Sequence, residues 1–309
     1  MRFKNAASMI SLAVAVSWIA HAGAVLQSPY SADYTLTQFS SISGVPANFG
    51  GVTFLNSNTI LLGGAANGAS GAIYSVPVLR DASNQITGFG SATLYASAPY
   101  IDGGLAFGTD GNLYFTEYPE NELGEITEPC TPPCSPNEQT VLTGIASSVG
   151  TIGFVPGGFQ GAGNAIIGSY SGGEWYNVTL SGGVPASPTL LENTGGGPEG
   201  IVWILAGSPD FPANTALVSQ YGTGTVVAYQ VDSNGAPTGS GQSFITGLTG
   251  AEGATIDPLT GDFLFSTFGG GSSLDVVAGF NAPSPEPASF SLIGLGLIGL
   301  AWRARRGRK

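Results

Sequence analysis

Apolar and polar residues alternate over short stretches of this chain, and one arrangement of these stretches recurs about every fifty residues. Each copy has a glycine-rich start, an alternating apolar stretch, a turn rich in Gly, Asn or Asp, and a second apolar stretch. The copies occupy residues 50–63, 103–117, 150–170, 199–220 and 252–267. Period-2 alternation between turn residues predicts pairs of β-strands joined as hairpins.

More strands follow each pair. Residues 71–76 and 224–229 are typical of a third strand, and residues 91–95 and 242–245 of a more polar fourth. Four antiparallel strands in each unit of about fifty residues predict a β-propeller, in which radial repetition protects the sheet edges. The fifth copy has no fourth strand of its own, and residues 34–39 could supply it and close the ring.

We therefore predict an all-β protein, a propeller of about five four-stranded blades. The chain has 49 glycines, 20 prolines and many β-branched and aromatic residues, which oppose long helices. Three alternatives remain open at this stage. A sixth, degenerate blade could lie in the irregular segments, or the strands could form a β-sandwich or a β-solenoid.

The N-terminal residues 1–24 have the pattern of a secretory signal peptide. Arg2 and Lys4 precede an apolar stretch, residues 6–20, and Ala22-Gly23-Ala24 is a small-residue cleavage site. We expect a signal helix here, removal by signal peptidase, and a mature chain that begins at Val25.

The C-terminal residues 284–309 contain three parts in a fixed order. Pro285, Glu286 and Pro287 come first, an apolar run at residues 288–302 follows, and a basic cluster including Arg303, Arg305 and Arg306 ends the chain. As a transmembrane helix the run would span about 22 Å, less than the roughly 30 Å of a bilayer core. The basic cluster favours a cytoplasmic end. The predicted domains are thus residues 1–24, 25–283 and 284–309.

These three parts together resemble the PEP-CTERM sorting signal of bacterial surface proteins. In that family a membrane enzyme, an exosortase, recognises the tail and cuts it near the Pro-Glu-Pro. The resemblance implies an exported protein of a Gram-negative-type envelope, anchored in the inner membrane as a precursor and then at the cell surface or extracellular. It also implies a link to exopolysaccharide or biofilm production.

The charged residues limit the kinds of functional site that the body of the chain can form. Twenty acidic residues lie between Asp33 and Glu286, against Arg80 alone, which gives a formal charge of −19, and the only histidine is His21 in the signal. A body with one basic residue cannot replace the counterions of a nucleic acid. It also lacks the histidine of a Ser-His-Asp triad or a His-based zinc site. Carboxylates, amides, hydroxyls and an oxygen-bound metal ion remain.

Three acids occupy equivalent places at the start of a first strand. Asp102, Glu199 and Glu252 align there, where the other two copies have Phe49 and Val149. The start of the first strand lies beside the channel of a propeller, so these acids could raise one another's pKa or bind a cation such as Ca²⁺. The alternatives are that they bond backbone amides or face solvent, or that they hold a catalytic metal.

Residues 197–203, Gly-Pro-Glu-Gly-Ile-Val-Trp, are similar to the Glu-Gly-Pro-x-Trp motif of gluconolactonase-type propellers, which hold a divalent metal with carboxylates and an Asn. The copies also resemble NHL propellers broadly. Two functions follow as hypotheses. One is a non-enzymatic surface module that binds polysaccharide or another envelope component, and the other a divalent-metal-dependent hydrolase or lactonase at the channel mouth. Trp175, Tyr176, Trp203 and Tyr221 could form a sugar-binding surface or belong to the core.

Cys130 and Cys134 lie four residues apart in a proline-rich segment. In an exported chain this spacing predicts a local disulfide that stiffens a loop.

Overall fold

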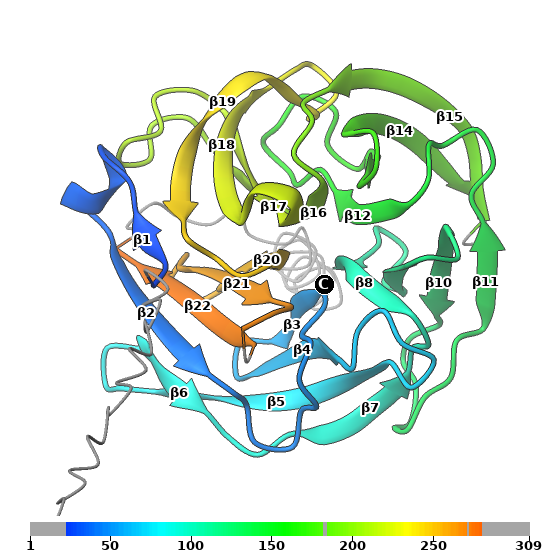
Figure 1. Ribbon diagram of the computed structural model, residues 1–309, viewed down its shortest axis with the longest axis horizontal. Coiled ribbons are helices and arrows are strands. Elements are labelled where there is room, and N and C mark those ends of the chain that lie inside the picture. Colours follow the sequence, from blue (N-terminus) through cyan, green and yellow to red (C-terminus); the bar gives the residue numbers. More distant parts are fainter. Residues whose placement is uncertain (1–22, 182–183, 271, 280–309) are drawn as a thin grey trace, which may run out of the picture.

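The computed structural model describes residues 23–181, 184–270 and 272–279, and in this part of the chain 22 β-strands form five sheets. The sheets surround a common axis as the blades of a propeller (Figure 1). The described helices are two 3-10 turns, η1 (Tyr30–Ala32) and η2 (Tyr221–Thr223). The predicted all-β fold and five blades are confirmed. The expected signal and sorting helices lie outside the described residues.

The strands of each blade follow one another outward from the axis. Blade 1 contains β3 (Val52–Asn56), β4 (Thr59–Gly64), β5 (Ala72–Arg80), β6 (Ile86–Phe89) and β7 (Thr93–Ser97). Blade 2 contains β8 (Ile101–Phe107), β9 (Leu113–Glu117), β10 (Glu122–Ile126) and β11 (Glu138–Val141). Blade 3 contains β12 (Val149–Phe154), β13 (Ala165–Ser169), β14 (Glu174–Ser181) and β15 (Val184–Asn193).

Blades 4 and 5 each include a strand from the N-terminal segment of the propeller. Blade 4 contains β16 (Pro198–Ile204), β17 (Thr215–Gln220), β18 (Thr225–Val231) and β19 (Pro237–Thr246), with β1 (Val25–Leu26) on its edge. Blade 5 contains β20 (Ala251–Ile256), β21 (Phe263–Thr267) and β22 (Ser273–Ala278), and its outer strand is β2 (Thr35–Ser40).

The pairing of β2 with β22 closes the ring. The register places Leu36 opposite Val277 and Phe39 opposite Leu274, so the strand before the first blade completes the last one. Figure 1 shows blue β2 alongside orange β22. The predicted closing strand, residues 34–39, is therefore confirmed. The sequence did not predict β6, which pairs with the far end of β5 while β7 pairs with its beginning.

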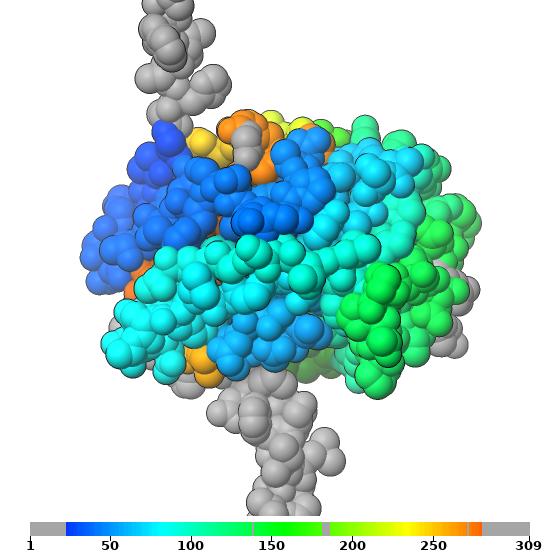
Figure 2. Space-filling model, turned by 90° about the horizontal axis from the view of Figure 1, so that it is seen from below, coloured from blue at the N-terminus to red at the C-terminus, as the bar shows by residue number. Residues whose placement is uncertain are grey.

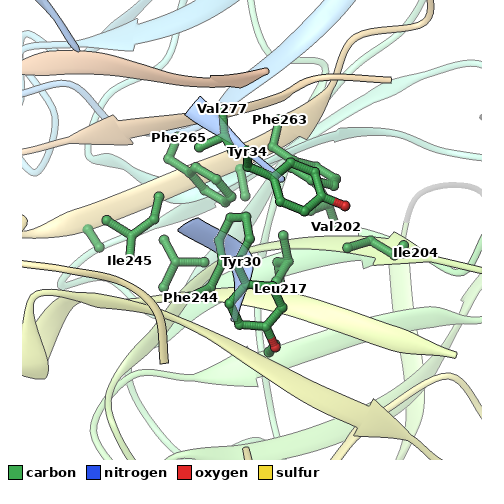
Figure 3. Packing of buried hydrophobic residues seen from close by; sticks show 14 of the residues in the cluster. Tyr30, Tyr34, Val202, Ile204, Leu217, Phe244, Ile245, Phe263, Phe265 and Val277 are labelled. Atoms are coloured by element: carbon green, nitrogen blue, oxygen red, sulfur yellow. The ribbon is translucent and has the colours of Figure 1, made fainter. Parts of the chain in front are cut away.

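Each junction between neighbouring blades has its own apolar core, so the described residues contain five cores rather than one. The core between blades 4 and 5 also takes Tyr30 and Tyr34 from the N-terminal segment (Figure 3). The Tyr30 ring packs edge-on against Phe244, with centroids 4.9 Å apart. Seen from the rim, the disc has the blue and cyan residues of its N-terminal third over much of its surface (Figure 2).

Buried hydroxyls connect the inner strands of adjacent blades. The Ser266 hydroxyl on β21 donates to the Gly50 carbonyl of blade 1 at 2.5 Å and accepts from the Gly253 amide at 2.8 Å. Thr116 on β9 makes the same two kinds of bond, to the Gly104 amide and to the Gly150 carbonyl. One side chain thus satisfies backbone groups of two blades at each of these junctions.

Replacing Ser266 with Ala is expected to lower the free energy of unfolding by about 2–3 kcal/mol, because it leaves a buried amide and a buried carbonyl without this partner. Urea denaturation of residues 25–283 measures the change. Ser219, the residue at the same place on β17, is a matched control, since its buried hydroxyl has no hydrogen-bond partner. Equal losses for Ser266→Ala and Ser219→Ala would contradict the bridging role.

Arg80 connects blade 1 to blade 5. The contact lies at the end of the disc opposite the predicted site of Asp102, Glu199 and Glu252. Its guanidinium donates to both carboxylate oxygens of Asp257, at 2.6 and 3.0 Å, and to the Ser57 and Asn84 carbonyls. The Asp257 side chain is fully buried. Such a bidentate pair fixes the relative position of the two blades.

Cys130 and Cys134 form a disulfide in the loop between β10 and β11. The Cys134 amide donates to the Tyr95 carbonyl, and the Ser97 amide donates to the Cys134 carbonyl, so this loop of blade 2 adds a short bridge to β7 of blade 1. The disulfide therefore holds a segment that joins two blades.

Candidate metal centre at the channel mouth

The structure brings Asp102, Glu199 and Glu252 together at one end of the central channel. They lie on the inner strands β8, β16 and β20 of blades 2, 4 and 5. Their side chains are 2%, 2% and 0% exposed. One carboxylate oxygen from each lies within 4.8 Å of the others. The alternative that these acids face solvent is wrong for all three.

Glycine makes this approach possible. A Cβ on Gly103 would lie 2.5 Å from the Glu199 Cβ and 2.9 Å from Glu252 Oε2, and one on Gly150 would lie 2.6 Å from Glu199 Oε2. Any other residue at Gly103 would therefore displace both glutamates. The glycine that follows Asp102 in the sequence shapes the space for the other two acids.

The carboxylates have few partners. Asp102 Oδ2, Glu199 Oε2 and both oxygens of Glu252 are buried and accept no hydrogen bond from an N–H group or a hydroxyl, although a proton on one of them lets Asp102 and Glu199 bond to each other. The one basic residue of the described chain, Arg80, is bound to Asp257 instead. Buried charges are normally paired or bind a metal, so these acids need either protons or a cation.

The pKa values of the three carboxyl groups reflect their burial and their small number of partners. Burial raises the pKa of Asp102 to about 8, although bonds from Asn67 and the Gly103 amide oppose the rise. Burial, followed by the charges of its two neighbours, raises the pKa of Glu199 well above its usual value. Burial and the charge of Asp102 do the same for Glu252. Each of the three acids therefore binds a proton more readily than an exposed carboxyl does, and a cation would compete for the same oxygens.

The set of donors fits a hard cation. With its amide turned to face its acceptors, Asn67 donates to Asp102 Oδ1 at 3.0 Å and to the Ile101 carbonyl at 3.2 Å. Ca²⁺ takes six to eight oxygen ligands, carboxylates and amide oxygens among them, at about 2.3–2.6 Å. Two such bonds span the separation of the carboxylate oxygens. The mouth cavity has a volume of about 100 Å³, enough for an ion with some water.

An aromatic collar surrounds the mouth. Tyr118, Tyr170 and Tyr221 line the cavity together with the acids and Asn67. Their rings pack edge to face in sequence, Tyr118 on Tyr170 at 6.3 Å and Tyr170 on Tyr221 at 5.8 Å, and Phe268 extends the row at 6.0 Å from Tyr221. Burial first, and then the charges of the acids, raise the pKa of Tyr170 and of Tyr221. Both hydroxyls are therefore protonated near the carboxylates.

The four aromatic residues of the collar occupy the same position in blades 2, 3, 4 and 5. Each of them directly follows the second strand of its blade, β9, β13, β17 or β21, and blade 1 has Ala65 at that place. The collar is therefore open at blade 1, where Asn67 reaches the acids. Sequence reasoning missed Tyr118, Tyr170 and Phe268, but an alignment of the second-strand ends would have found them.

The other aromatic candidates have different places. Trp175, Tyr176 and Trp203 are buried in the cores between blades, and only Tyr221 of the four lies at the mouth. The Trp175 indole donates to Thr194 and the Trp203 indole to the Gly235 carbonyl. Trp175, Tyr176 and Trp203 therefore belong to the core, which was one of the two sequence interpretations.

Comparison with protein families finds one feature outside the described residues. Residues 285–306 match the PEP-CTERM protein-sorting motif, and Pro285, Glu286, Pro287, Arg303, Arg305 and Arg306 lie within the match. The motif implies an exported bacterial protein that an exosortase-type enzyme processes. In the described part of the chain, no helix is both long and apolar enough to cross a membrane.

Several solved structures match this chain at low identity. A calcium structure of Trichoderma reesei Carbohydrate-Active Enzymes Family AA12 is 12% identical over 85% of this chain and 98% of that chain, with a TM-score of 0.49. A streptogramin B lyase is 13% identical over 82% and 100%, with a TM-score of 0.43. A 6-phosphogluconolactonase-like protein from Bacteroides uniformis is 12% identical over 77% and 69%, with a TM-score of 0.41. No curated protein matches the chain.

Proposed function

We propose that this protein is an exported surface module that binds a divalent cation, Ca²⁺, at its channel mouth and a polysaccharide or another envelope component beside it. In this proposal signal peptidase removes residues 1–24 and the propeller occupies residues 25–283. Residues 284–309 anchor the precursor in the inner membrane of a Gram-negative-type bacterium until the exosortase-type enzyme cuts the tail. The product then acts at the cell surface, in exopolysaccharide or biofilm formation.

The observation that carries the proposal is the set of four buried carboxylate oxygens that no N–H group or hydroxyl reaches. Three acids from three blades converge on one point, and the one arginine of the described residues lies at the other end of the disc. A Ca²⁺ ion would neutralise the charge and supply the missing contacts. The collar, with Tyr118 more than one-third exposed, offers ring faces beside the ion to a sugar or another ligand.

The proposal favours binding over catalysis because of the residues at the mouth. A hydrolase needs a general acid or base within reach of its substrate. The three acids would be occupied with the ion, and the remaining polar groups there are the Asn67 amide and the tyrosine hydroxyls. The second hypothesis, a metal-dependent hydrolase or lactonase, uses the same ion and predicts turnover of lactones, which a substrate assay measures directly.

Millimolar Ca²⁺ is expected to raise the melting temperature of residues 25–283 by about 5–10 °C relative to EDTA. A ligand at a hundred times its dissociation constant adds about 2.7 kcal/mol, and 1 kcal/mol corresponds to about 2–4 °C for a domain of this size. This part of the chain contains all five sheets and their cores, so it is a complete folding unit.

Two variants sharpen this test. Glu252→Gln is expected to fold at least as well as the parent in EDTA, because it removes a buried charge, and to lose most of the Ca²⁺ shift. Asp275→Asn is the matched control, since Asp275 is also fully buried but lies on β22 outside the cluster. The proposal fails if the parent shows no shift, or if Glu252→Gln keeps the full shift.

A further inference from the structure

The channel opens at its other end into a wide apolar funnel. Its volume is about 690 Å³, and the ends of the inner strands of all five blades line it. No charged side chain lies in its wall, which includes Phe54, Leu55, Phe107, Phe154, Ile201 and Leu259. We call this cavity the apolar funnel.

The rim of the funnel exposes large apolar side chains to water. Leu55 is 37% exposed and Leu259 is 50% exposed, in a protein whose body has a formal charge near −19. A concave apolar surface of this kind in a soluble domain marks a binding site rather than ordinary surface. The question is which apolar partner covers it.

The described chain ends beside this funnel. Ile256, which lines the funnel, pairs with Phe263, and Phe263 pairs with Val277 on the next strand. Neighbouring strands lie about 4.8 Å apart, so the end of β22 is only about 10 Å from the funnel wall. β22 runs in the same direction as β20, away from Glu252, and Gly279 follows it on the funnel side.

An apolar segment of the same chain follows within reach. Nine residues beyond Gly279, at residue 288, begins the apolar run 288–302, with Phe290, Leu292 and Ile293 near its start. Nine extended residues span up to about 30 Å, three times the distance to the funnel wall. A tether this short gives an effective concentration in the millimolar range. A separate apolar partner would have to be present at millimolar concentration to compete with this segment.

We propose that the apolar funnel holds the beginning of the segment 288–302 while the precursor awaits insertion and processing. The wall removes Phe290, Leu292 and Ile293 from water, and the propeller thereby shields its own sorting segment from aggregation. Removal of residues 284–309 by the sorting enzyme then opens the funnel. This inference is independent of the acid cluster, which lies at the opposite mouth.

Cross-linking tests the placement directly. In a chain of residues 25–309, the pair Leu259→Cys and Phe290→Cys is expected to form an intramolecular disulfide under mild oxidation in most molecules. The control pair places the first cysteine at Leu190 on β15, an equally exposed leucine far from the funnel, and is expected to cross-link at least tenfold less. Equal cross-linking of the two pairs, or links mainly between molecules, would overturn the proposal.

Dye binding gives a second measurement. The apolar dye Nile red is expected to bind residues 25–283 at least tenfold more tightly than residues 25–309, where the segment competes for the funnel. Leu259→Asp should weaken the dye binding of residues 25–283, and Leu190→Asp should leave it unchanged. Equal dye affinity for the two chains would show that the segment does not occupy the funnel.

Discussion

Substituting methionine for Arg80 is expected to lower the free energy of unfolding by about 3–5 kcal/mol. Arg80 makes the one ion pair of the described chain, and its partner Asp257 is fully buried. Without the guanidinium, Asp257 retains bonds from the Leu259 amide and the Thr260 hydroxyl but keeps an uncompensated charge in the interior. Breaking one side of a buried pair leaves that charge unpaired, which is why the loss is large.

Urea denaturation of residues 25–283 measures the change. The double variant Arg80→Met with Asp257→Asn removes both charges and is expected to recover a large part of the loss, because the neutral amide needs no counter-ion. A loss below about 1 kcal/mol for the single variant would mean that the pair acts as an exposed one. It would then not hold blade 1 against blade 5.

In EDTA, the free energy of unfolding is expected to fall by at least about 3–4 kcal/mol between pH 5 and pH 8. Asp102, Glu199 and Glu252 have raised pKa values in the folded state, and an unfolded carboxyl titrates near pH 4. Above that pH the folded state binds more protons than the unfolded state, so stability declines as the pH rises toward the folded values. Asp102 alone, with its pKa at about 8, retains about one proton over these three pH units, which corresponds to about 4 kcal/mol, and Glu199 and Glu252 add to this decline.

Saturating Ca²⁺ is expected to remove the part of this decline that comes from Asp102, Glu199 and Glu252, because the ion replaces their protons. Burial also raises the pKa of Glu117 to about 7 and that of Asp275 to about 6, and these acids contribute a decline of the same sign. They lie outside the cluster, so their share should persist in Ca²⁺. If the decline were identical in EDTA and in Ca²⁺, the titration of the three channel acids would not be its cause.

The blade pattern could be predicted because its signals are local. Alternation within 50–63 and the later copies marks inner strands, and turn residues separate them. The place of residues 34–39 in blade 5 followed by elimination, since only that blade lacked an outer strand. β6 escaped prediction because residues 86–89 are a short insertion whose pairing with the long strand β5 depends on how far that strand extends.

The candidate site could be predicted only in part. Aligning strand starts placed Asp102, Glu199 and Glu252 at one end of the channel, but their separation depends on backbone contacts such as those at Gly103. The collar escaped prediction because Tyr118, Tyr170 and Phe268 were not aligned with Tyr221, although each directly follows the second strand of its blade. Arg80 and Asp257 are 177 residues apart and share no pattern. The funnel escaped too, since an apolar inner strand gives the same signal whether or not side chains fill the axis.

The pairing of β2 with β22 sets the order of events during export. A secreted chain crosses the membrane with its N-terminus first, so β2 emerges long before β22 exists to receive it. Only six residues separate the end of β22 at Ala278 from Pro285. The last blade can therefore close only after almost all residues before the Pro-Glu-Pro have been exported. Closure of the ring is therefore a late event, which follows the export of almost the whole propeller.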